Sequence, residues 1–263
     1  MVLLAVLSAI AAIYAGSYWY VRRRGGKWPA WRALSFVLGI STLMAGGSPP
    51  LMERAHHDIY SHMVQHLLIG MFAPIFLVVG APFTLALKTL PAAPARRLMA
   101  LLKHKAFRVA CHPVAAMVFN IGGMYVLYLS PLYAESLAKP YLHHVIHFHF
   151  LAAGYLFTWA IIGPDPVPAR PSFQVRAWVL FFSIAAHAFL AKYMYAHFYP
   201  RNVPFTGEAI RSAAQMMYYW GDLAELIVAF ILFAQTPFAK RLSAMPSRRS
   251  IWPPLAWLTL FFQ

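Results

Sequence analysis

Long apolar runs are the feature that most constrains what this chain can fold into. Runs of about twenty residues recur along it, and twenty residues at about 1.5 Å per residue cross a bilayer core of about 30 Å as a helix. Strands of a membrane barrel would instead alternate over about ten residues. Of the 263 residues, 61% are hydrophobic and 11% are charged, whereas soluble domains have about 25% charged residues. The pattern predicts an all-α, polytopic membrane protein.

Seven membrane-spanning helices are expected, forming one bundle over residues 1–240. The first apolar run is followed by Arg22, Arg23 and Arg24, and because a cleavable signal peptide carries its positive charge in front, this run is interpreted as a helix. Pro74 predicts a kink in the third helix. The tail at 241–263, basic and then apolar, is too short to span and is expected at the membrane interface. The expected helices are 1–21, 33–47, 59–87, 107–129, 142–162, 173–198 and 208–234.

The net charge of +15 lies in short loops between apolar runs, which indicates a topology signal rather than a nucleic-acid surface. Seventeen Lys and Arg residues fall on one side of the seven predicted helices, and four, Arg54, Lys139, Arg201 and Arg211, fall on the other. The side with seventeen is expected to be cytoplasmic, so the N-terminus is predicted outside and the C-terminus inside. The seventeen are Arg22, Arg23, Arg24, Lys27, Arg32, Lys88, Arg96, Arg97, Lys103, Lys105, Arg108, Arg170, Arg176, Lys240, Arg241, Arg248 and Arg249.

A histidine-rich stretch opens the third predicted helix. His62 and His66 are four residues apart, which places both imidazoles on one helix face, and such pairs commonly present two nitrogen ligands to one metal ion. Gly70 and Ala73 are expected to continue this face with small side chains that let a neighbouring helix approach. The earlier pair, His56 and His57, is expected to lie in a loop without a role.

Other polar residues are predicted in the outer half of the membrane or at its midplane. An Asp at the centre of a membrane helix costs about 2.5–3.5 kcal/mol on insertion scales, so Asp222 must face the bundle and have a partner. His187 is either a ligand or that partner, and Glu225 is expected to handle protons or to orient a ligand. His149 points about 200° away from His147 on its helix and is expected outside the site. The candidate metal ligands are His62, His66, His143, His144, His147, His187, Met194 and Asp222.

Copper fits these candidate ligands best. Cys111 is the one cysteine, so disulfides and thiolate clusters within the chain are excluded, and imidazole with an occasional thioether suits Cu(I), with Zn²⁺ close behind. A haem is the weaker alternative because the third helix lacks a second histidine thirteen or fourteen residues away, and no CxxCH is present. Asp222, Gln215, Tyr60 and Tyr218 are expected to orient imidazole N–H groups.

The motif YSHMVQHLLIGMFAPIFLVVGAPF resembles the signature of the CtaG family of seven-helix cytochrome c oxidase assembly factors. The histidine-rich fifth helix is similar to a later helix of that family, whereas the last helix departs from it at Ala214, Tyr218 and Tyr219, and an acid reappears at Asp222. The resemblance covers residues 20–235. The matching residues are Tyr60, Ser61, His62, Met63, Gln65, His66, Leu67, Leu68, Ala73, Pro74, Gly80 and Pro82.

The resemblance implies a non-enzymatic role in a bacterial inner membrane, in which copper is taken from the periplasmic side, through a copper donor there, and delivered to a haem-copper oxidase subunit. The resemblance assigns this copper-handling role to His62 and His66, and also to His147. The resemblance does not specify whether the protein acts as a monomer or as a homodimer. The alternatives are a copper or cation transporter, which would need polar sites in the inner leaflet as well, and a haem-binding or quinone-binding redox protein, which would be coloured if it held haem.

Overall fold

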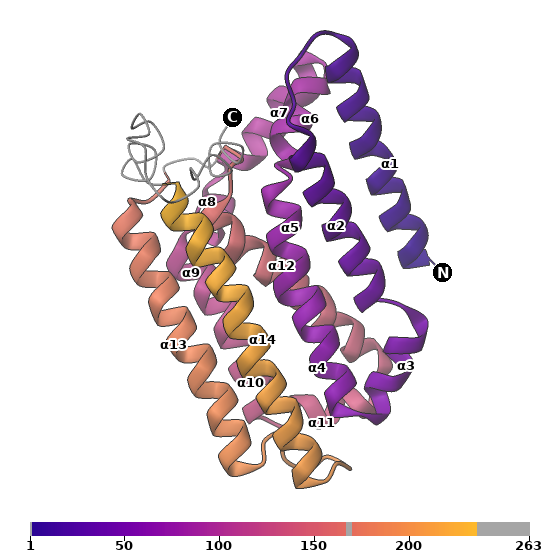
Figure 1. Cartoon of the computed structure of the whole chain (residues 1–263), viewed down its shortest axis with the longest axis vertical. Helices are drawn as coiled ribbons and strands as arrows, with labels where there is room; N and C mark the ends of the chain where they lie inside the picture. The colour runs from indigo at the N-terminus through magenta and orange to yellow at the C-terminus, as the bar shows by residue number, and fades with distance from the viewer. Residues whose placement is uncertain (1, 167–169, 236–263) are drawn as a thin grey trace, which may run out of the picture.

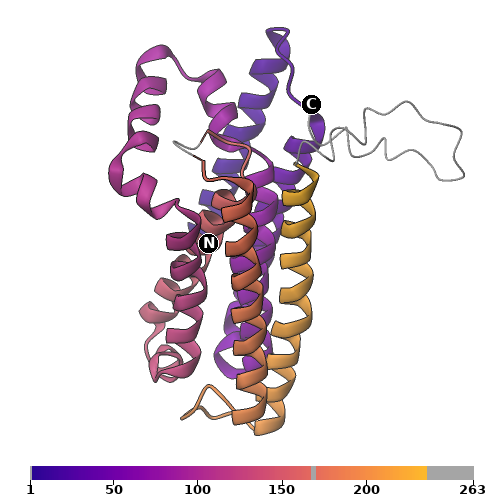
Figure 2. The same ribbon diagram turned by 90° about the vertical axis from the view of Figure 1, so that its left-hand side faces the viewer.

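The computed structural model describes residues 2–166 and 170–235, which are helical without a strand. Long helices run side by side, and short helices lie at both ends of the bundle (Figure 1; Figure 2). The predicted interfacial tail lies outside the described residues. The segments, with π-helical turns marked η, are α1 (Val2–Arg23), α2 (Ala30–Gly46), α3 (Pro49–His57), α4 (Ile59–Leu67), η1 (Leu68–Phe72), α5 (Ala73–Val79), α6 (Pro82–Thr89), α7 (Ala92–Lys103), α8 (Lys105–Ala110), α9 (Pro113–Met117), η2 (Val118–Gly122), α10 (Gly123–Leu129), α11 (Leu132–Ala138), α12 (Pro140–Ile162), α13 (Phe173–His197) and α14 (Gly207–Ala234).

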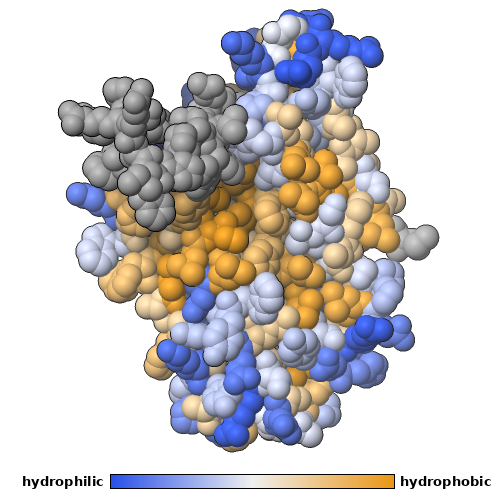
Figure 3. Space-filling model, viewed as in Figure 1, coloured by the Kyte–Doolittle hydropathy of each residue, from blue (hydrophilic) through white to orange (hydrophobic). Residues whose placement is uncertain are grey.

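The all-α, polytopic prediction is confirmed. Five continuous helical stretches in the described residues are long and apolar enough to cross a membrane, and the number rises to seven if two bent pairs each count as one span. One pair is α2 with α3, bent by 48°, and the other is α9–α10 with α11, bent by 73°. Apolar residues form a band across the middle of the molecule, with hydrophilic residues towards both ends (Figure 3).

The predicted third and fourth helices are longer than the structure allows. The third span ends at Val79, not at residue 87, because Ala81 takes a left-handed φ of 51° and Pro82 opens α6. The fourth was expected from residue 107, but α8 ends at Ala110 and Pro113 opens α9. In both places the cause is a proline, which has no N–H to donate and excludes helical geometry from the preceding residue.

A π-helical turn accommodates Pro74, which was expected to kink the third helix. Because Pro74 has no N–H, it cannot close the helical hydrogen bond to the Gly70 carbonyl, and the chain widens over η1 just before it. Gly154 of α12 packs against this carbonyl: a Cβ at position 154 would collide with Gly70 O and lie 3.2 Å from Pro74 Cγ. The two helices therefore approach closely where neither carries a side chain.

The π turn also changes which side of the third span faces which neighbour. Gly70 stays beside the histidines, since a Cβ there would lie 3.4 Å from Phe150 Cβ and 3.7 Å from His66 Nδ1. Ala73, predicted on the same face, packs instead in the apolar cluster formed with α1 and α2. The prediction for Ala73 was wrong because η1 has more residues per turn than the α-helix assumed in counting faces.

The ends of the bundle differ in charge and in content. The short helices α6, α7 and α8 lie at the top of Figure 2, where they carry many of the basic residues of the chain. There Asp165, after α12, accepts hydrogen bonds from the Thr84 amide at 2.7 Å and from its hydroxyl at 2.6 Å, which fixes the start of α6. The opposite end, with α3 and α11 (Figure 1), holds the histidine-bearing starts of α4 and α12.

Candidate metal centre

Helix α4 carries His62 and His66 into the bundle because its start is fixed by a side-chain cap. The Asp58 carboxylate accepts from the Tyr60 amide at 3.1 Å, the Ser61 amide at 2.9 Å and the Ser61 hydroxyl at 2.7 Å, satisfying donors that the first helical turn leaves unpaired. His62 is 1% exposed and His66 is 2% exposed. Both imidazoles are thus buried, as their spacing predicts.

Helix α12 brings His143 and His147 against His62. The ring centroids of His143 and His147 are 4.2 Å apart, and they lie 6.0 Å and 5.8 Å from that of His62. Imidazoles bound to one ion through nitrogens about 2.0–2.1 Å from it would have centroids about 5 Å apart. The three rings, named here the imidazole cluster, therefore lie within about 1 Å of the centroid spacing of rings that share one ion.

The protein orients these rings but leaves one nitrogen of each without a partner. His147 Nδ1 lies 2.8 Å from the His143 carbonyl, to which its N–H donates, so that Nε2 carries the lone pair. His62 Nε2 lies 3.3 Å from the Tyr128 hydroxyl. Among the described residues, no hydrogen bond reaches the buried atoms His62 Nδ1, His143 Nε2 and His147 Nε2. Unpaired buried nitrogens are costly in an apolar interior, and a metal ion would satisfy them.

His56 lies beside the imidazole cluster and in helix α3, not in a loop as expected. Its ring centroid is 4.2 Å from that of His143, because α3 folds back across the end of the bundle. The sequence signal is Pro49–Pro50, since proline is favoured in the first helical turn and here opens α3.

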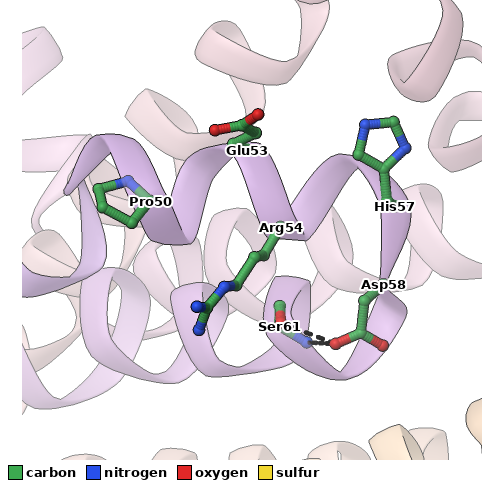
Figure 4. Close-up of a pocket in the computed structure, with 6 residues that line it drawn as sticks. All are labelled: Pro50, Glu53, Arg54, His57, Asp58 and Ser61. Carbon is green, nitrogen blue, oxygen red and sulfur yellow. Dashed lines mark hydrogen bonds between the residues drawn. The ribbon is translucent and has the colours of Figure 1, made fainter.

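His57 is exposed and lies outside the imidazole cluster. It lines a surface cavity of about 580 Å³ at the turn between α3 and α4. Figure 4 shows Glu53 and His57 on one edge of α3 and Arg54 on the other, with Asp58 at the turn and Ser61 on the following helix α4. The lining is charged and open to solvent.

A second group of candidate residues gathers deeper in the bundle, between α13 and α14. His187, Asp222 and Glu225 each offer one ligand atom, and these atoms all lie within 4.8 Å of one another. His187 is fully buried, and Glu225 is 4% exposed. This group, named here the carboxylate triad, combines two residues from the candidate set with Glu225, for which the sequence indicated proton handling or support of a ligand.

His66 connects the two groups. It lies near both His147 of the imidazole cluster and His187 of the carboxylate triad. Both of its ring nitrogens are buried, and neither has a hydrogen-bond partner in the described part of the chain. The predicted ligands therefore form two separate groups with one histidine between them.

The remaining predicted residues lie apart from both groups. His144 is exposed, with its ring centroid 6.3 Å from that of His143, and Met194 packs in the apolar core. His149 Nε2 lies 3.1 Å from the Phe119 carbonyl of η2, on the far side of α12, as its position on the helix predicts. Tyr60 and Gln215, expected to orient imidazoles, are exposed.

Fold and site together define a helical, polytopic membrane protein with buried histidines at one end of its bundle. The chain belongs to the cytochrome c oxidase caa3 assembly factor family, whose sequence model matches residues 12–237. The resemblance noted in the sequence is thereby confirmed, and the membership associates the chain with the assembly of cytochrome c oxidase.

Similar proteins occur in mycobacteria. The chain is 34% identical over 187 residues to uncharacterized proteins of Mycobacterium bovis and Mycobacterium tuberculosis, a match that covers 68% of this chain and 28% of each relative. An uncharacterized protein of Mycobacterium leprae is 33% identical over 183 residues, covering 67% of this chain and 28% of the relative. The chain thus spans a little over a quarter of the length of these relatives. No solved structure matches the chain.

Proposed function

We propose that this protein serves oxidase assembly by holding Cu(I) on the imidazole cluster and passing it to a membrane subunit of a haem-copper cytochrome c oxidase, without catalysing a reaction itself. The observation that carries the proposal is the convergence of three imidazoles, each with a buried nitrogen that no described residue satisfies. Membership of the assembly factor family supplies the process in which such an ion would be used.

The ligand chemistry favours copper over the alternatives. The imidazole cluster is free of thiolate and carboxylate, and its neutral nitrogens suit Cu(I), with Zn²⁺ the next best fit. The Tyr128 hydroxyl contacts Nε2 of His62 and the His143 carbonyl contacts Nδ1 of His147, so the opposite nitrogen of each ring is left for a metal ion.

The charge distribution supports an orientation in which the imidazole cluster faces the outside of a bacterial inner membrane. Seventeen Lys and Arg residues belong to the opposite side by sequence, and four belong to the histidine side. In that orientation a periplasmic donor would deliver copper at the starts of α4 and α12, and transfer to an oxidase subunit would take place sideways within the bilayer.

Copper binding to the purified, detergent-solubilised protein tests whether the imidazole cluster holds Cu(I). Cu(I) is titrated under reducing conditions against a coloured chelator, with wild type beside the His62→Ala/His147→Ala double variant. The control is His197→Ala, because His197 is exposed at the same end of the bundle. We expect one Cu(I) per chain in wild type and control, and loss in the double variant. Equal binding by all three proteins would refute the imidazole cluster as the copper site. Copper transport into proteoliposomes would favour a transporter.

Cysteine labelling tests the orientation. Burial raises the pKa of the Cys111 thiol to about 11, so this thiol stays protonated and reacts poorly with maleimides. In intact cells, a membrane-impermeant maleimide should label Glu53→Cys at the histidine end and spare Lys103→Cys at the other end until the cells are opened. The reverse pattern would overturn the orientation.

A further inference from the structure

The carboxylate triad is a site distinct from the imidazole cluster, with different chemistry. Its imidazole comes from α13 and its two carboxylates from neighbouring turns of α14, three residues apart. His187 Nδ1 lies 3.5 Å from Glu225 Oε2, beyond an ordinary hydrogen bond. His187 and Glu225 thus lie within ion-pair distance of each other without a hydrogen bond between them.

Four buried polar atoms of the triad have no hydrogen-bond partner among the described residues. Both ring nitrogens of His187, Oδ1 of Asp222 and Oε2 of Glu225 are buried without a hydrogen-bond partner. In native proteins nearly all such atoms have partners, so four unpaired atoms at one point indicate that something absent from the chain itself completes the site.

The backbone makes room for the imidazole. A Cβ at Gly221, the residue before Asp222, would collide with His187 Cε1 and lie 2.9 Å from Nδ1. Since any residue other than glycine would push the ring aside, α14 is built to admit His187 beside its own carboxylates. Ser183, one turn before His187 on α13, adds a buried hydroxyl without a partner.

Charge decides which ligand the site would take. Two carboxylates in an apolar span repel each other and need compensation, yet in the described part of the chain no Lys or Arg forms an ion pair with either. The ammonium of Lys192 lies over the Tyr218 ring at 4.9 Å. A divalent cation with two carboxylates and a neutral imidazole has no net charge, whereas Cu(I) would leave one negative charge uncompensated.

We infer that His187, Asp222 and Glu225 form a second metal site, which takes a divalent first-row transition ion of the Zn²⁺ type. One imidazole and two carboxylates is a ligand set that such ions accept, with a fourth position left for water. The inference does not depend on copper binding at the imidazole cluster, because the two sites share no ligand. His66 lies between them and belongs to neither ligand set.

Binding of Zn²⁺, and of Co²⁺ as its coloured substitute, to the full-length protein in detergent tests the site. Glu225→Gln keeps the shape and removes the charge, and Glu208→Gln at the exposed start of α14 is the matched control. With the imidazole cluster removed by His62→Ala/His147→Ala, we expect one Zn²⁺ per chain with or without Glu208→Gln, and an affinity at least about 100-fold lower when Glu225→Gln is added, more than the loss of a supporting group causes. The visible bands of tetrahedral Co²⁺ should vanish in the same variant.

Measuring both metals on both variants separates this inference from the proposed function. His62→Ala/His147→Ala should keep Zn²⁺ binding, while Glu225→Gln should keep Cu(I) binding. Should Glu225→Gln misfold, Gly221→Ala provides an independent test, because it displaces His187 without changing a ligand. Zn²⁺ affinity unchanged in both Glu225→Gln and Gly221→Ala, or loss of Zn²⁺ binding in the His62/His147 variant, would overturn the second site.

Discussion

Replacing Gly154 by alanine should destabilise the protein and weaken copper binding from a position that touches no ligand. In a helix, alanine is favoured over glycine by about 1 kcal/mol, but here the new methyl group would collide with the Gly70 carbonyl and lie 3.0 Å from Gly70 C. To reach ordinary contact, α12 and η1 would have to separate by clearly more than about 1 Å, and overpacking of this kind typically costs about 1–3 kcal/mol. The net expectation is a loss of up to about 2 kcal/mol.

Gly16→Ala is the matched control, because Gly16 lies in α1 and a Cβ there meets nothing within 4 Å. Gly16→Ala should gain the same helix-propensity contribution without the collision, so the two variants should differ by the overpacking cost of about 1–3 kcal/mol. At about 2–4 °C per kcal/mol this is several degrees in unfolding temperature. Thermal unfolding in detergent, followed by circular dichroism, measures the difference.

The same shift moves His143 and His147 relative to His62. Since metal sites require ligand distances within about 0.2 Å, Cu(I) affinity in Gly154→Ala should fall at least about tenfold, which equals about 1.4 kcal/mol. A Gly154→Ala protein as stable as Gly16→Ala, with wild-type copper affinity, would refute the inferred close contact between α12 and η1.

Three other changes should be measurable by the same unfolding assay. Tyr14→Phe removes the hydroxyl that donates to the Gly80 carbonyl at 2.7 Å, and should cost about 1 kcal/mol, with Tyr18→Phe as control. Gln65→Leu leaves the Gly46 carbonyl, 2.9 Å from Nε2, without its donor, and should cost about 1–3 kcal/mol; an unchanged stability would mean that the bond contributes nothing. Burial raises the pKa of the Asp165 carboxyl above its ordinary value. The contribution of this shift to stability is therefore present below about pH 4 and declines as the pH rises through the raised pKa. Asp165→Asn should remove this decline, and a pH profile of stability identical to that of wild type would contradict the expectation.

The sequence predicted the fold class because membrane spans depend on length and hydropathy, which are local properties. It predicted that His62 and His66 lie together on one helix face, because a spacing of four defines a helix face without knowledge of the neighbours. The helix ends were less well predicted. Ala81 and His112 precede prolines that end one helix and open the next, although the apolar run continues through both places.

The division of the candidate ligands into two sites could not be predicted. It depends on which helix packs beside α4, and nothing local to α14 shows that its carboxylates meet His187 while α12 meets His62. The place of His56 depends likewise on the fold of α3 across the end of the bundle. Position along a span indicated the approximate depth of each residue, but contacts between helices determine its partners.

The π turn η1 also bears on how this chain can change over generations. An ordinary helix that gains one residue turns everything beyond it by about 100°, so an insertion within a packed span disrupts every contact that follows. A π turn confines the extra residue to one place. The half of the span that carries His62 and His66 and the half that packs on α1 and α2 therefore keep their own neighbours despite the extra residue, and loss of a single codon between positions 68 and 72 would return η1 to an ordinary helical turn with both halves still in place.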